Sequence, residues 1–221
     1  MRTGSLGAGL GVLAVAWFGP LPSLTTNSFA AHMTMHIAVV AVAAPLLALA
    51  MAGTKTDPVG AIPSLVAAIP ASMAELVVVW AWHLPALHHA ARHQTGAFIL
   101  EQGSFVIAGV LLWIAAIGGN HEQRRLRAGS GIVALLFTSM HMTLLGALFA
   151  LANRPLFEHT PPVGASTAIT DQQLGGVIML LVGGASYLLG GLGLTAVALG
   201  AKGAAAVGGR IPHRSQRGST V

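Results

Sequence analysis

Six long apolar segments, separated by short polar linkers, constrain the fold of this chain more than any other feature. They span residues 4–22, 31–52, 61–82, 98–118, 131–152 and 173–199. A helix that crosses a bilayer needs about 20 mostly apolar residues, and each segment is close to that length. The pattern therefore predicts an all-α, polytopic membrane bundle of about six transmembrane helices, with the lipid bilayer as its surroundings.

The low charge content excludes several classes of protein. Only 8% of the 221 residues are charged, against roughly 25% in soluble domains, so a soluble enzyme, a disordered chain and a nucleic-acid-binding protein are all excluded. The sequence has no P-loop, GxSxG or HExxH motif, and we therefore predict no catalytic residues and no enzymatic activity. It also contains no cysteine, which excludes disulfides and thiolate metal ligands.

The distribution of basic residues predicts the orientation of the bundle. With the N terminus inside, nine Lys and Arg residues lie on the cytoplasmic side, and only Arg92 and Arg154 lie outside. Loops rich in Lys and Arg stay in the cytoplasm, so we expect both termini to be cytoplasmic. We divide the chain into a single bundle, residues 1–201, and a flexible basic cytoplasmic tail, residues 202–221.

Histidine is concentrated on the predicted outer side of the bundle. Seven of the ten histidines fall there: His32, His36, His83, His88, His89, His93 and His159. His32 and His36 are four residues apart, so they share one face of a helix, with Met33 and Met35 flanking that face. Imidazole and thioether ligands together suit copper, and thioether favours Cu(I) in particular.

Two further histidines are candidate ligands. His83 ends the third segment on the outer side, and His141 lies within the fifth segment. Neutral histidine also ligates haem iron. The residues therefore leave a haem b site open as the alternative to copper, with His36, His83 or His141 as axial ligands.

Three carboxylates lie in or near the apolar segments. Glu75 is in the outer half of the third segment, Glu101 opens the fourth and Asp171 opens the sixth. A carboxylate in lipid costs roughly 3 kcal/mol, so these side chains should face the interior, where they could support or gate a metal site. Asp171 is also a candidate N-cap of the sixth helix.

Glycine doublets recur along the sixth segment, at residues 175–176, 183–184 and 190–191. Such a stripe of small residues lets helices approach closely. It serves either packing within the bundle or docking to the helix of a partner.

Several short motifs occur in order between residues 30 and 190 and point to one family. They are Ala31-His-Met-Thr-Met-His36, Ala44-Pro-Leu-Leu47, Trp82-His-Leu-Pro85, Leu100-Glu101 with Trp113, Gly146-Ala-Leu148 before Pro155-Leu156, and Asp171-Gln-Gln-Leu-Gly-Gly176 with Met179. With these motifs the chain resembles the CtaG-type assembly factors of caa3-class cytochrome c oxidases, which are bacterial multi-span membrane proteins.

The resemblance implies a non-enzymatic role in maturing a haem–copper oxidase in the bacterial inner membrane. Copper would reach the oxidase from the outer face, and the implied partners are oxidase subunits and a copper donor protein on the outer side. The polar positions that match the family are His32, His36, His83 and Asp171. The chain departs from the family pattern at Gln102, where a histidine often stands, and in having six predicted spans instead of seven. A haem b-binding or structural subunit of a respiratory complex is the alternative role.

Overall fold

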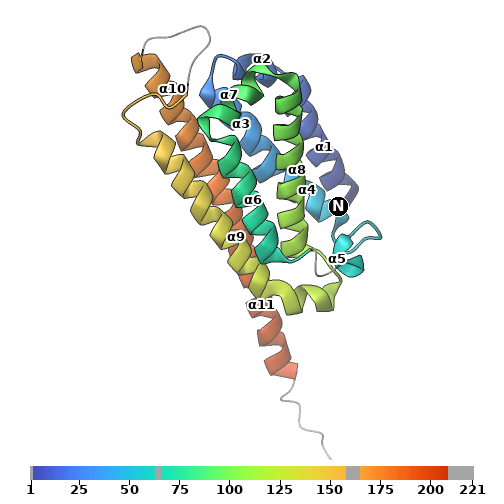
Figure 1. The fold of residues 1–221 in the computed structure, drawn as a ribbon. Helices are drawn as coiled ribbons and strands as arrows, with labels where there is room; N and C mark the ends of the chain where they lie inside the picture. Colours follow the sequence, from blue (N-terminus) through green and yellow to red (C-terminus); the bar gives the residue numbers. More distant parts are fainter. Residues whose placement is uncertain (1, 63–65, 158–164, 209–221) are drawn as a thin grey trace, which may run out of the picture.

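The computed structural model describes residues 2–62, 66–157 and 165–208, and within these ranges the chain is helical, without strands (Figure 1). The predicted all-α fold is confirmed. The elements are α1 (Arg2–Phe18), α2 (Leu21–Thr25), α3 (Phe29–Ile37), η1 (Ala38–Ala43), α4 (Ala44–Met51), α5 (Pro58–Ala61), α6 (Ala68–Trp82), α7 (Pro85–His93), α8 (Thr95–Ile117), α9 (His121–Ala150), α10 (Ala165–Ile178), η2 (Met179–Gly184) and α11 (Ala185–Gly208).

Four helices in the described residues are long and apolar enough to cross a membrane. They cover Phe29–Met51, Thr95–Ile117, Glu122–Ala150 and Ser166–Gly200. The structure supports a membrane bundle but leaves the predicted count of six unconfirmed, because α1 and α6 have 17 and 15 residues, fewer than the roughly 20 that a span needs.

Local sequence explains why these two helices are short. The Gly19-Pro20 pair follows Phe18, the last residue of α1, and proline disfavours a helical conformation in the residue before it. Ala67 is extended, so α6 begins at Ala68 and not at the predicted residue 61. Both helices nevertheless pack within the bundle, since Ala16 and Val79 are buried.

Other helix boundaries also differ from the sequence prediction. The α9 helix begins at His121, in the predicted linker, because Asn120 and Gln123 form a reciprocal capping box there. The α10 helix begins at Ala165, and α11 continues to Gly208, past the predicted domain boundary. His159 and residues 209–221 lie outside the described residues, so the flexible tail stays a prediction.

The bundle has two chemically distinct ends. One, which we call the basic end, contains the start of α1, the loop before α5 and the start of α9 (Figure 1). There Asp57 accepts hydrogen bonds of 2.6 Å from the amides of Gly53 and Gly119, and both glycines have positive φ, 69° and 87°, which other residues rarely adopt. The opposite end, which we call the histidine end, contains α2, α7 and residues 151–157.

Two π-helical segments interrupt the membrane helices. Pro45 cannot donate a hydrogen bond to the carbonyl oxygen of Ala41, one turn before it, and this leaves that carbonyl without its usual partner. Ser186 Oγ donates to the Ala41 oxygen at 2.8 Å, across from α11. The π-helical geometry of η1 therefore coincides with a cross-helix hydrogen bond that compensates for the proline.

The glycines of the last helix pack inside the bundle. A Cβ atom at Gly176 would lie 2.4 Å from the Ala150 nitrogen, and one at Gly190 would lie 2.5 Å from the Trp113 ring. Gly146 on α9 lies at the same close crossing, because a Cβ atom there would be 2.7 Å from the Leu180 nitrogen. Of the two uses expected for the doublets, packing within the bundle is confirmed.

Candidate metal centre

Three buried side chains converge near the histidine end: His32 and His36 on α3, and Glu101 on α8. The Nε2 atoms of the two histidines are 2.7 Å apart, and each lies 3.3 Å from Oε1 of Glu101. Within the described part of the chain, these residues are the one group of three whose ligand atoms all lie within 4.8 Å of one another. We refer to His32, His36 and Glu101 as the trio.

The N-terminus of α3 is anchored from two sides, and this places the two histidines of the trio. Ser28 caps the helix through a hydrogen bond that its hydroxyl accepts from the Ala31 amide at 3.1 Å. Asp171 reaches across from α10 and accepts hydrogen bonds from the Ser28 hydroxyl at 2.7 Å and the Phe29 amide at 2.5 Å. Because α10 begins at Ala165, Asp171 is not the N-cap of its own helix; it caps α3 instead.

Gln102 and Trp17 form a hydrogen-bonded chain that ends at the trio. The Gln102 amide nitrogen lies 3.2 Å from Glu101 Oε2 and 3.3 Å from His36 Nδ1. The Trp17 indole donates to Gln102 Oε1 at 3.0 Å, and an indole N–H can only donate, so it determines which end of the amide is the oxygen. The amide nitrogen therefore faces His36, and His36 Nδ1 must be an acceptor.

His83 and Met33 border the trio. The His83 ring centroid is 5.9 Å from that of His36, its Nδ1 lies 2.6 Å from the Val79 carbonyl oxygen and its Nε2 lies 3.4 Å from the Met33 sulfur. Of the predicted ligands outside the trio, His83 is therefore adjacent to it, and Met33 contacts His83. Their ligand atoms face each other.

His141 and Met35 are buried but do not join the trio. The ring neighbour of His141 is Phe137, and neither ring nitrogen has a hydrogen-bond partner among the described residues. Met35 is fully buried in the apolar core. Depth in the membrane was predictable for both residues, but the direction of each side chain around its helix was not.

His88 and Arg92 on α7 complete the surroundings of the trio, and the sequence placed His88 only in an outer loop. The His88 ring is 2% exposed and packs edge-on against His32, with 4.6 Å between centroids. Arg92 donates to His88 Nε2 at 3.3 Å and to the Thr26 carbonyl oxygen. Burial, together with the nearby His32 and Arg92, lowers the pKa of His88 well below its usual range, so its imidazole is neutral.

Glu75 belongs to a second polar contact, deeper in the bundle. Its carboxylate accepts a hydrogen bond from the Tyr187 hydroxyl on α11, and the hydroxyl oxygen also lies 3.2 Å from the Val40 carbonyl oxygen in η1. Both side chains are fully buried. No hydrogen bond or ion pair between Glu75 and the trio is found in the described residues, so a supporting role there is not visible in the structure.

The donor atoms of the trio fit a metal ion. For bonds of about 2.0–2.1 Å in tetrahedral geometry, ligand atoms lie roughly 3.3 Å apart, which is the separation of Glu101 Oε1 from each histidine nitrogen. The two nitrogens would have to separate slightly from 2.7 Å. Glu101 Oε1 has no well-aligned hydrogen-bond donor within the described residues. A cation bound by the trio would therefore supply the partner that this buried oxygen lacks.

Comparison with known proteins identifies one family. The family model described as cytochrome c oxidase caa3 assembly factor (Caa3_CtaG) matches residues 1–199. No curated protein and no solved structure is significantly similar to the chain.

Proposed function

The chain belongs to the Caa3_CtaG family of cytochrome c oxidase caa3 assembly factors, and from this premise we propose that it carries copper as a cargo for the oxidase. His32, His36 and Glu101 would hold the ion, with Met33 and His83 beside them. The observation that supports this role is the convergence of two imidazole nitrogens and one carboxylate in a buried position.

The charge of the trio favours a bound cation. Glu101 is completely buried, and a buried carboxylate is stable only when it is protonated, paired or coordinated. Oε1 of Glu101 lies 3.3 Å from the Nε2 atoms of both histidines. A monovalent copper ion at this position would supply the positive charge that neutral imidazoles cannot.

Copper is favoured over other ions by affinity and by the neighbouring sulfur. Two imidazoles and a carboxylate bind divalent first-row metals in the Irving–Williams order, in which copper is strongest. Met33 lies between the two histidines in the sequence, and its thioether is the soft ligand that Cu(I) prefers. The assembly role involves ligand exchange without turnover.

The location of the trio supports transfer on the outer side of the bacterial inner membrane. The basic end carries Arg2, Lys55, Arg124, Arg125 and Arg127, whereas the histidine end carries Arg92 and Arg154. By the positive-inside rule the basic end is cytoplasmic. The trio would then face the side from which a copper donor protein arrives. A reporter fused after residue 202 should be cytoplasmic, and an external reporter would contradict this orientation.

Haem b is the alternative that the site must be tested against. The His32 and His36 rings touch, with 4.1 Å between centroids, and His36 packs on Phe105 at 4.4 Å. Side chains therefore occupy the space in which a porphyrin would have to insert between axial ligands. This packing favours a single ion over a macrocycle.

Metal analysis of the full-length purified protein tests the proposal. We expect about one equivalent of copper at the trio, lost in the His32→Ala/His36→Ala variant and kept in His141→Gln, which changes a buried histidine outside the trio. Zinc is offered in parallel, to compare the two ions. A Soret band in the purified protein, or full copper retention by the double variant, would contradict the proposal. In cells that lack this protein, the wild-type chain should restore the copper content of the oxidase and the double variant should not.

A further inference from the structure

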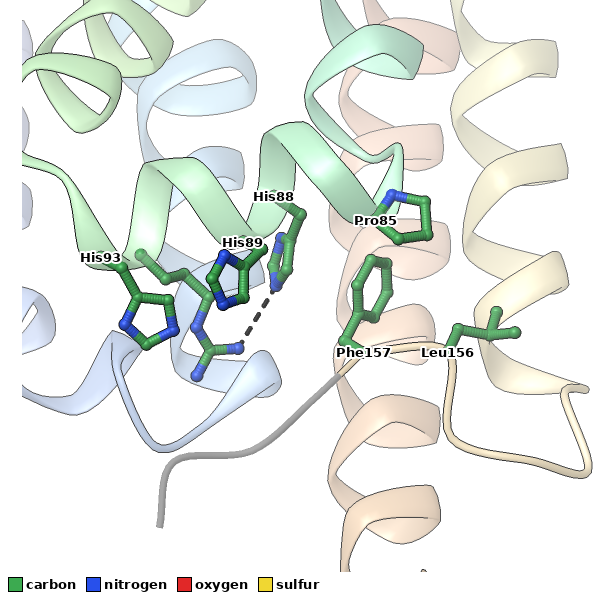
Figure 2. Close-up of a pocket in the computed structure, with 7 residues that line it drawn as sticks. Pro85, His88, His89, His93, Leu156 and Phe157 are labelled. Atoms are coloured by element: carbon green, nitrogen blue, oxygen red, sulfur yellow. Dashed lines mark hydrogen bonds between the residues drawn. The ribbon is translucent and has the colours of Figure 1, made fainter. Parts of the chain in front are cut away.

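A second pair of histidines lies on the surface of the histidine end, on α7. His89 and His93 are exposed, four residues apart on α7, and their ring centroids are 4.3 Å apart. Figure 2 shows both rings on the same side of the helix, at the edge of a pocket of about 210 Å³. The pair repeats the spacing of His32 and His36, but in a position open to solvent.

Two pockets connect this pair to the buried trio. The pocket in Figure 2 is lined by His89 and His93, and also by His88, which packs on the His32 ring. A second pocket, of about 230 Å³, is lined by both His93 and His32. Surface and buried histidines thus share the walls of the same cavities.

His88 has the properties of an intermediate ligand between the exposed histidine pair and the buried trio. Its Nδ1 atom is buried without a hydrogen-bond partner within the described residues. Its Nε2 atom accepts a hydrogen bond from Arg92, which lines both pockets. Because Nε2 accepts, Nδ1 carries the ring proton, so His88 would ligate an ion in transit through Nε2 once the Arg92 side chain moves away.

We propose that His89 and His93 form an outer capture site for Cu(I), from which the ion passes by way of His88 to the trio. The inference rests on the proposed copper cargo. Each step exchanges one imidazole ligand for another; copper remains Cu(I), no electron is transferred, and each imidazole that is released stays neutral. Arg92 acts as a gate, because its positive charge stands where the cation must pass and its N–H group occupies the lone pair of His88 Nε2.

The rate and extent of copper loading test the capture site. Full-length protein in detergent is mixed with a coloured Cu(I)–chelator complex, and the transfer is followed by absorbance. We expect the His89→Ala/His93→Ala variant to bind about one equivalent less copper and to load the trio more slowly than the wild type. The control Leu87→Ala changes another exposed residue of α7 and should load normally. Replacing both histidines with methionine, another Cu(I) ligand, should restore fast loading.

The outcomes separate this inference from the proposed function. Wild-type stoichiometry and rate in His89→Ala/His93→Ala would overturn the capture site while leaving the trio intact as a copper site. Loss of all copper from that variant, with none lost from His32→Ala/His36→Ala, would instead overturn the role of the trio. The gate is tested by Arg92→Gln, which removes the charge and should load faster; an unchanged or slower rate would refute gating.

Discussion

The Nε2 atoms of His32 and His36 are 2.7 Å apart, which is a hydrogen-bond distance, so one of the two nitrogens holds a proton between them. Both atoms also face Oε1 of Glu101 at 3.3 Å. The proton and a metal ion would therefore compete for the same position. Copper can bind both nitrogens only after this proton has moved to another atom, such as Nδ1 of His36.

We predict that copper affinity falls at pH values low enough to protonate the imidazoles of the trio, because a metal binds only a deprotonated nitrogen. In that acidic range the affinity should decrease about tenfold per pH unit for each proton that the metal displaces. Competition with a coloured chelator at several pH values measures this slope. An affinity that stays constant throughout the acidic range would show that the nitrogens of the trio are not the ligands.

Glu101→Gln should weaken copper binding by roughly 10- to 100-fold, since the amide keeps the shape of the side chain but lacks its negative charge. The same chelator competition measures the loss. Glu122→Gln, at an exposed position at the start of α9, is the matched control and should bind like the wild type. Equal affinities for the two variants would exclude Glu101 as a ligand or counter-charge.

Trp17→Phe should tighten copper binding. In a metal-bound neutral imidazole His36 Nε2 coordinates the ion and Nδ1 carries the proton, but Nδ1 faces the nitrogen of the Gln102 amide, which also donates. The amide must therefore turn over, and the Trp17 hydrogen bond opposes that turn. Removing a hydrogen bond worth about 1 kcal/mol should increase the affinity roughly fivefold.

Gln102→Met is the control for the Trp17 variant, because it removes the amide altogether. In the Gln102→Met background, Trp17→Phe should have no further effect on copper affinity. An equal gain in both backgrounds would mean that Trp17 acts through packing and not through the orientation of the amide.

The sequence predicted the pairing of His32 and His36 because helical periodicity alone determines it. Glu101 was expected only as a supporting or gating group, since its entry into the trio depends on how α8 is rotated and staggered against α3. The same limitation applies to His141, which the sequence placed within a membrane segment and whose ring packs beside Phe137. His88 was missed as a neighbour of the trio because α7 folds over the bundle, and no periodicity in a nine-residue segment shows that.

Boundaries were predictable where turn chemistry is strong and not where it depends on tertiary contacts. Gly19-Pro20 marks the end of α1, and the Asn120–Gln123 capping box is readable in the sequence although we predicted a linker there. Pro45 is a local signal for the irregular geometry at η1, but the hydrogen bond that Ser186 donates to the Ala41 carbonyl oxygen joins residues far apart in the chain. A contact of that range leaves no local signal.

Asp171→Ala should destabilise the start of α3. The carboxylate accepts hydrogen bonds from the Ser28 hydroxyl and from the amides of Phe29 and Ala30. Loss of a helix cap costs about 0.5–2 kcal/mol, and copper affinity should also fall, because His32 lies in the first turn. Thermal unfolding in detergent and chelator competition measure the two effects. Thr170→Ala, an exposed neighbour, should change neither stability nor copper affinity. An Asp171→Ala variant with the stability of the wild type would contradict the capping role.

Tyr187→Phe should destabilise the bundle without affecting copper binding. The Tyr187 hydroxyl donates to the buried Glu75 carboxylate, and a buried acceptor that loses its partner costs about 1–3 kcal/mol. The ring itself, which stacks on Trp113 with 5.4 Å between centroids, is kept by phenylalanine, so the change isolates the hydrogen bond. Because replacing both partners by apolar groups can be nearly neutral, Tyr187→Phe/Glu75→Met should be more stable than Tyr187→Phe alone. Unfolding of the wild type, the two single variants and the double variant forms a double-mutant cycle that measures the coupling free energy. Strictly additive effects would show that the two side chains do not stabilise each other.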